Sequence, residues 1–379
     1  MNGRAIAKAG QKVQFPGTGG QSSLDFHSRP DGAGVFAATA GGGFYYSSNS
    51  ETKDDGGVGV IEFDANGDPI DYYRTLSGTR DNCGGGYTPW NTWISCEEDG
   101  SIGRVWQTDP TGLIPSRRTE VVATGGNYES FAYDDREELT KPRFFTTEDS
   151  TSGPLVRFTP NAMGMECYNQ PTAEEKWCTL ENGDHDYLRI DDGASGTFSW
   201  VANKTQATPE LYPKAEGIDV VDGVLFFVSK LDKTLFELDL DAGTFTRTST
   251  VSGAFDLQPD QLKAINNDPS PDSVENNIIY FCEDGGANSD IHGRNTLSGE
   301  YFTIVRGDDY ATETTGLAFS PDLKYMFIAF QGPGVIWQFW RDDGLPFNGQ
   351  IVDIKYHSEI QRRRLSEQPL LRARPRHHY

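Results

Sequence analysis

Residues 44–64 read FYYSSNSETKDDGGVGVIEFD, which is a pair of short strand-like segments joined by a polar turn that ends in glycine. The same pattern returns along the chain. The first strands of the six copies are FYYSSNSE (44–51), TWISCEED (92–99), RFFTTEDS (143–150), GVLFFVSK (223–230), NIIYFCEDG (277–285) and YMFIAFQ (325–331). The second strands are GVGVIEFD (57–64), SIGRVWQTD (101–109), GPLVRFTP (153–160), KTLFELDL (233–240), GEYFTIV (299–305) and GVIWQFW (334–340). A repeat of about 50 residues built on paired strands is typical of a β-propeller blade.

The spacing of these copies predicts an all-β fold, a six-bladed β-propeller in one domain over residues 1–345. A longer step between the third and fourth copies predicts an insertion at about 161–210. Residues 346–379 form an extension whose arginine-rich end is expected to be disordered. A β-sandwich or an up-and-down barrel also produces repeated hairpins, but six near-equal units exceed what a sandwich needs.

Composition supports this fold class and limits the partners. Aromatic residues make up 12% of the chain, and 42 glycines and 20 prolines supply turns. The formal net charge of −23 argues against nucleic acid, which requires a basic surface. No apolar run is long enough to span a membrane, and MNGRAIAKAGQKV (1–13) lacks the apolar core of a signal peptide. Cys167 and Cys178 are close enough in sequence for a local disulfide, which fits an oxidising compartment.

Residues of types that can bind metals precede several of the first strands. Cys83, Glu129, Glu216, Asp260 and Glu313 each lie where a propeller places its innermost strand. Charged carboxylates facing one axis need compensation, because an unpaired buried charge is costly. We therefore expect metal cations in the central channel. Oxygen ligands suit calcium, whereas the thiol of Cys83 suits a transition metal.

The stretch DNCGGGYTPWNTWISCEED (81–99) is the most specific motif, and here the sequence resembles the PhoX alkaline phosphatase family. Further resemblance lies in SNSE (48–51), NYESFA (127–132), KAEGID (214–219), QPDQL (258–262) and ETTGLAFSPDLKYMFIAFQGPG (313–334). It extends over residues 40–340. The chain departs from the family pattern at Lys214, where the family has arginine, and at Gln331–Gly334, where a histidine is missing.

The resemblance implies a six-bladed propeller with Fe³⁺ and Ca²⁺ in its channel, exported from the cell and used in phosphate acquisition. It implies hydrolysis of phosphate monoesters and, in some members, diesters. The residues that match the family's iron ligands are Cys83, Glu98, Glu129 and Glu216. Those that match its calcium ligands are Glu51, Asp149, Asp284 and Glu313. Asn49 and Lys214 match its contacts to substrate phosphate. We expect a monomer acting on a small phosphoester in a secreted, periplasmic or cell-surface location.

Two other functions remain open from the sequence. One is a non-catalytic, calcium-stabilised propeller that binds a partner or a glycan, which Lys214 and the missing histidine would permit. The other is a different propeller hydrolase, such as a lactonase or a phytase-like enzyme.

Overall fold

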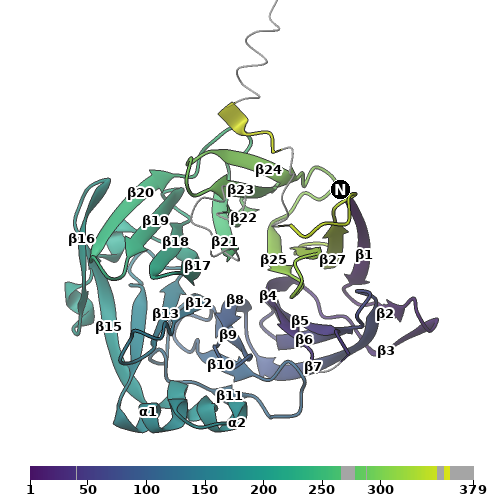
Figure 1. Cartoon of the computed structure of the whole chain (residues 1–379), viewed down its shortest axis with the longest axis horizontal. Coiled ribbons are helices and arrows are strands. Elements are labelled where there is room, and N and C mark those ends of the chain that lie inside the picture. Colours follow the sequence, from purple (N-terminus) through teal and green to yellow (C-terminus); the bar gives the residue numbers. More distant parts are fainter. Residues whose placement is uncertain (40, 266–277, 287, 348–353, 359–379) are drawn as a thin grey trace, which may run out of the picture.

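The computed structural model describes residues 1–39, 41–265, 278–286, 288–347 and 354–358, so the arginine-rich end predicted to be disordered lies outside the described residues. Strands dominate, and their sheets stand around a common axis (Figure 1). The prediction of an all-β propeller is therefore confirmed. Among the described residues, no helix is both long and apolar enough to cross a membrane.

Four of the sheets have four strands each. One contains β4 (Pro30–Ala37), β5 (Phe44–Ser50), β6 (Gly56–Phe63) and β7 (Pro69–Thr79). Another contains β8 (Asn82–Tyr87), β9 (Trp93–Glu97), β10 (Val105–Thr108) and β11 (Arg117–Arg118). A third contains β21 (Gln258–Ile265), β22 (Ile278–Asp284), β23 (Ile291–Asn295) and β24 (Tyr301–Val305). The fourth contains β1 (Asn2–Lys8), β27 (Val335–Trp340), β26 (Tyr325–Phe330) and β25 (Thr314–Phe319). A separate hairpin consists of β2 (Lys12–Phe15) and β3 (Gly20–Asp25).

A larger sheet of nine strands fills the rest of the ring. Its order is β12 (Tyr128–Asp134), β13 (Arg143–Glu148), β14 (Val156–Pro160), β15 (Gly183–Ile190), β16 (Ser195–Val201), β20 (Thr244–Ser249), β19 (Thr234–Asp239), β18 (Val224–Ser229) and β17 (Ala215–Val221). Pairing of β16 with β20 joins what would otherwise be two sheets. Because of this continuity, the count of six blades stays a prediction.

Six strands form the inside of the ring, namely β4, β8, β12, β17, β21 and β25 (Figure 1). Each contacts the next, and β25 contacts β4, so the circle closes. Apolar side chains pack between neighbouring sheets. For example, Tyr46 of β5 packs on Phe327 of β26 and Phe36 of β4 on Tyr87 of β8, with ring centroids 5.1 and 5.0 Å apart. Burial of such a side chain contributes about 1.5–3 kcal/mol, so these contacts keep the inner strands in place.

The predicted hairpins match paired strands, with one exception. The structure pairs β22 with β23, and β24 lies on the far side of β23. The prediction that residues 277–285 pair directly with 299–305 is therefore wrong. The intervening strand reads IHGRN, which has a single apolar residue, and so its burial was not visible as an apolar run.

The segment at 161–210, predicted as an insertion, contributes both helices and strands. It contains α1 (Ala162–Tyr168), α2 (Ala173–Lys176), the 3₁₀ turns η1 (Trp177–Glu181), η2 (Lys204–Gln206) and η3 (Pro209–Leu211), and strands β15 and β16. Those strands extend the ring's own sheet, since β15 pairs with β14. The boundaries of an insertion therefore stay a prediction.

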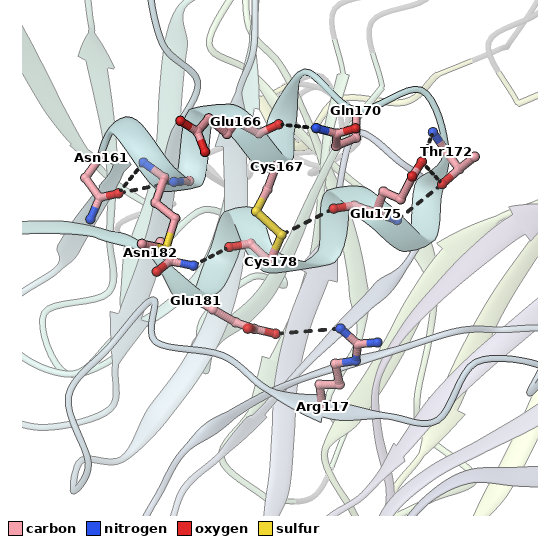
Figure 2. The surroundings of a disulfide bond; sticks show 12 residues. Arg117, Asn161, Glu166, Cys167, Gln170, Thr172, Glu175, Cys178, Glu181 and Asn182 are labelled. Carbon is pink, nitrogen blue, oxygen red and sulfur yellow. Dashed lines mark hydrogen bonds and ion pairs between the residues drawn. A yellow bond between two sulfur atoms is a disulfide. The ribbon is translucent and has the colours of Figure 1, made fainter.

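A disulfide joins α1 to η1 through Cys167 and Cys178 (Figure 2). The helices begin at side-chain caps: Asn161 accepts from the amides of α1, and Thr172 forms a capping box with Glu175. Glu181 lies 4.0 Å from Arg117, which attaches the helical segment to β11. The predicted local disulfide is thus present.

Candidate metal centre in the central channel

Each of the six inner strands carries a β-bulge near its start, where three residues on the inner strand span two on its partner. A bulge redirects the side chain of the extra residue. The residues at this position are Asp31, Cys83, Glu129, Glu216, Asp260 and, in β25, Gly316. The five with side chains are all buried, and we call them the inner ring.

A second set of polar residues lies at the end of each strand that pairs with an inner strand. This rim ring consists of Glu51, Glu98, Asp149, Lys230, Asp284 and Gln331. Repeated backbone hydrogen bonds fix their positions. The amides of Glu51 and Asp149, for instance, donate to the carbonyls of Arg29 and Asn127, each two residues before an inner-ring residue, over 3.0 and 2.8 Å. The two rings therefore follow from one local structure repeated around the axis.

Cys83 lies among carboxylates. Donor atoms of Glu51, Cys83 and Glu98 all fall within 4.8 Å of one another. The thiol sulfur is also 3.7 Å from Oδ2 of Asp31. Burial, together with Asp31, Glu129 and the two rim glutamates, raises the pKa of the Cys83 thiol well above its usual range. A bound cation would reverse this effect, because it stabilises the thiolate.

A second group of donors consists of Glu129, Glu216 and Asp260, whose ligand atoms also lie within 4.8 Å of one another. All three side chains are buried. Neither carboxylate oxygen of Glu129 has a hydrogen-bond partner within the described ranges. Burial and then the carboxylate of Glu216 raise the pKa of Glu129 well above its usual range, and burial raises the pKa of Asp260 to about 7. These unpartnered oxygens fit a cation.

Lys230 supplies a positive charge inside the acidic site. Its ammonium lies 2.8 Å from Asp284, 3.3 Å from Glu216 and 4.0 Å from Asp149. Burial opposes the charge, but the surrounding carboxylates outweigh it and raise the pKa of Lys230. The Glu216 contact is an ion pair without hydrogen-bond alignment, since Oε1 of Glu216 has no hydrogen-bond partner in the described chain.

The predicted phosphate contacts lie in different surroundings. Lys214 is at the rim, with its ammonium 2.8 Å from Asp149 and its side chain 38% exposed. Asn49 is fully buried. Its amide group donates to the carbonyls of Cys83 and Gly84 over 2.7 and 2.6 Å, and its oxygen accepts from the indole of Trp93 over 2.9 Å. Both amide hydrogens of Asn49 are thus used to hold the backbone at Cys83.

Glu313 reaches the cluster by another route. It precedes β25, and the bulge position in that strand is Gly316 with φ of 62°. A Cβ at Gly316 would lie 2.6 Å from the hydroxyl of Tyr46 and 3.2 Å from the Asp31 carbonyl. A side chain therefore does not fit at this point of the ring. Burial, Asp260 and Asp31 raise the pKa of Glu313, so its carboxyl does belong to the same electrostatic group.

Four residues of the site were not predicted, namely Asp31, Lys230, Gln261 and Gln331. Asp31 is the inner-ring member of the first sheet. Gln331 donates to Asp31 and Glu51 over 2.6 and 2.8 Å, and Gln261 donates to the other oxygen of Asp31 over 2.6 Å. A signal for Asp31 exists, because RPDG (29–32) has the same order of side chains as KAEG (214–217).

A cavity of about 580 Å³ occupies the other part of the channel. Its lining includes Gly32, Ser130 and Gln261, which directly follow members of the inner ring, but no ring member itself. It extends along the later residues of the inner strands, where Lys263 is 2.7 Å from Asp219. The acidic side chains therefore lie at one end of this cavity and do not line it.

The fold and the site together define a β-propeller whose channel carries an inner ring of four buried carboxylates and one thiol, with further carboxylates at the rim. The family model described as "Alkaline phosphatase PhoX" matches residues 60–225. This match covers less than half of the chain, and it supports the resemblance to the PhoX family that the motifs predicted. It points to a phosphatase as the reaction class. It includes Cys83, Glu98, Glu129, Asp149 and Glu216.

Similar solved structures are distant in sequence. Periplasmic gluconolactonase from Pseudomonas aeruginosa is 12% identical with a TM-score of 0.48, over 93% of this chain and 94% of that chain. Virginiamycin B lyase from Staphylococcus aureus is 10% identical with a TM-score of 0.45, over 90% and 100% of the two chains. At these values the likeness carries no argument about the reaction. No curated relative matches the chain.

Proposed function

We propose that this protein is a metal-dependent phosphatase that hydrolyses phosphate monoesters, and diesters as a lesser activity, in its central channel. The observation that supports this most is the presence of two groups of metal-binding side chains, one around Cys83 and one around Glu129. In the second group, carboxylate oxygens of Glu129, Glu216 and Asp260 have no hydrogen-bond partner among the described residues, so a cation would be needed to stabilise their negative charge. The match to the PhoX family supplies the reaction class.

In this proposal the residues divide by ligand type. Cys83, Glu98, Glu129 and Glu216 hold iron, because thiolate with carboxylates suits a transition metal. Glu51, Asp149, Asp284 and Glu313 hold calcium, which prefers oxygen. Asp31 and Asp260 add carboxylates to these shells. When bound, the cations neutralise charge on the phosphoryl oxygens and lower the pKa of bound water.

The cationic side chains at the rim would orient the substrate phosphate. Lys214 lies at the rim of the channel, where its partly exposed ammonium is ion-paired with Asp149. Arg29 has the equivalent place before β4, is ion-paired with Glu51, and has a side chain that is 48% exposed. A guanidinium grips phosphate through two parallel hydrogen bonds, whereas an ammonium acts as a point charge. Arg29 would thus supply the guanidinium that Lys214 lacks. Asn49 would position Cys83 and not contact substrate.

We further propose export to an oxidising compartment and action as a monomer. The Cys167–Cys178 disulfide supports the first of these, because structural disulfides persist outside the reducing cytosol.

The test is turnover of p-nitrophenyl phosphate by metal-replete protein at alkaline pH. EDTA should abolish it, and Cys83→Ala should remove both activity and iron. Cys96→Ala is the matched control, since Cys96 is buried in a hydrophobic cluster with Ile94 and Val105. Absence of turnover in protein that contains iron and calcium would refute the phosphatase. Calcium-dependent stability without turnover would favour the binding protein, and turnover of a gluconolactone alone would favour a lactonase.

A further inference from the structure

A second cluster of metal-binding side chains lies inside the sheet of β21–β24, apart from the two rings. It consists of Glu283, Asp290 and His292, whose donor atoms lie within 4.8 Å of one another. Their exposed fractions are 0%, 2% and 0%. Glu283 precedes Asp284 of the rim ring in β22, and successive side chains of a strand point to opposite faces. The cluster therefore faces away from the channel donors.

His292 is oriented as a ligand would be. Its Nε2 lies 3.1 Å from Oε2 of Glu283, yet this nitrogen has no hydrogen-bond partner among the residues described. Its Nδ1 is 3.1 Å from the hydroxyl of Thr303, and its ring stacks on Phe255 with centroids 4.3 Å apart. In metal sites the second ring nitrogen of a histidine ligand is typically bonded to an oxygen, which fixes the ring orientation.

Backbone amides hold the two carboxylates. Oε1 of Glu283 accepts from Leu257 over 3.0 Å, Oε2 accepts from Asp290 over 2.9 Å, and Oδ1 of Asp290 accepts from Gly307 over 2.9 Å. Each carboxylate oxygen keeps lone pairs after one such bond. The three side chains are therefore fixed before any ion arrives, which reduces the entropy lost on binding.

Charge also favours a divalent cation. The cluster has two carboxylates. Within the described residues, Arg306 forms an ion pair with it from outside, with its Nε 3.2 Å from Oδ2 of Asp290 and its side chain 56% exposed. A pair with so exposed a partner is weak. A divalent ion at the cluster would neutralise both carboxylates directly.

We propose that Glu283, Asp290 and His292 bind one Zn²⁺ ion at a structural site distinct from the channel. One imidazole with two carboxylates is a ligand set that zinc accepts, with metal–ligand distances near 2.0–2.2 Å. The ion would brace the turn between β22 and β23. Thr314 links that turn to β25, because its hydroxyl contacts the carbonyls of Glu283 and Asp290 over 3.2 and 3.1 Å. The site would in this way steady Asp284 and Glu313, which flank it.

Zinc binding to metal-stripped full-length protein tests the proposal, measured by competition with a chromophoric chelator. Wild type should bind one equivalent more than His292→Gln. Glu129→Gln, which alters only the channel, should retain that equivalent. His185→Gln is the matched control, because His185 has its Nε2 2.8 Å from the Glu120 carbonyl and lies outside the cluster.

Equal zinc content in wild type and His292→Gln would overturn the proposal, because the three side chains would then hold only a proton. Should His292→Gln not fold, crystals of wild type soaked in zinc chloride decide the matter. An anomalous peak at the zinc edge between the three side chains is expected, and its absence would overturn the site. Neither result depends on phosphatase activity, so failure here is distinguishable from failure of the channel proposal.

Discussion

Lys230 is the residue that most changes the charge of the channel. It stands in the rim ring, where four of the other members are carboxylates. Its ammonium compensates Asp284 and Glu216 without a metal ion, and so it reduces the number of cations that the site needs. The ammonium of Lys230 therefore provides one positive charge that a bound metal ion would otherwise have to provide.

Replacing Lys230 should therefore make folding depend more on metal. Lys230→Gln leaves Glu216 and Asp284 without their nearest cation, and loss of one partner of a buried pair costs about 3–5 kcal/mol. In urea unfolding with EDTA we expect a loss of that size, which added calcium should largely restore. The control is Lys204→Gln, which should lose less than about 1 kcal/mol, because the Lys204 side chain is 51% exposed and its ammonium is 3.6 Å from Glu148. Similar losses in both variants would contradict this account of Lys230.

At the scale of the elements, the bulges of three inner strands have a glycine next to the ring residue, at Gly32, Gly84 and Gly217, where a Cβ would meet neighbouring backbone. Gly84 follows Cys83, and a Cβ there would lie 2.3 Å from the Glu129 carbonyl and 2.5 Å from its Oε1. The close approach of β8 and β12 thus depends on the missing side chain. It is also what brings Cys83 near Glu129.

Gly84→Ala should separate these two strands. Overpacking of this kind costs about 1–3 kcal/mol, and we expect the iron content to fall because the donors move apart. Thermal unfolding and elemental analysis measure the two effects. Gly17→Ala is the control, since a Cβ at Gly17 meets no atom within 4 Å. Full iron content in a folded Gly84→Ala protein would show that the strand spacing does not set the site.

Much of this element scale could be predicted from the sequence. The paired strands can be predicted because apolar residues and turns recur along the chain. Four of the five inner-ring residues can also be predicted, because each is a metal-binding residue type that precedes the first strand of a hairpin. Asp31 was missed because it lies before the first recognised hairpin. Asn49 was expected to contact substrate, since a motif gives residue types but not the partners that occupy them. Strand β23 was missed because a buried strand that contains His292 and Arg294 does not have an apolar pattern.

At the scale of the whole molecule, the chain has a net charge of −23 and concentrates carboxylates around one axis. Burial raises the pKa of Glu98 to about 8 and that of Asp260 to about 7, whereas unfolded carboxyl groups titrate near 4. Without metal, the folded state therefore binds more protons than the unfolded state between these values. Stability must fall as pH rises through that interval.

Metal-free protein should accordingly be more stable at pH 5 than at pH 8. For each group, a difference of one unit between its pKa in the folded and in the unfolded state changes the free energy of unfolding by up to about 1.4 kcal/mol. Calorimetric Tm values in EDTA at the two pH values test this, and calcium with iron should remove the difference by replacing the protons. A Tm in EDTA that is flat or rises from pH 5 to pH 8 would show that the carboxyl groups are not buried as described.

The pairing of β1 with β27 has a consequence for how the molecule is made. Asn2 of β1 pairs with Trp340 of β27, which are the first and the last of the described strands in sequence order, so β1 can pair only after β27 has been synthesised. Until then β1 and the newest strand of the growing ring both have unpaired edges, and unpaired edges invite association between chains. The ring also closes through contacts that are remote in sequence, which fold slowly. Folding during synthesis should therefore depend on chaperones that cover the unpaired edge of β1 until β27 is available to pair with it.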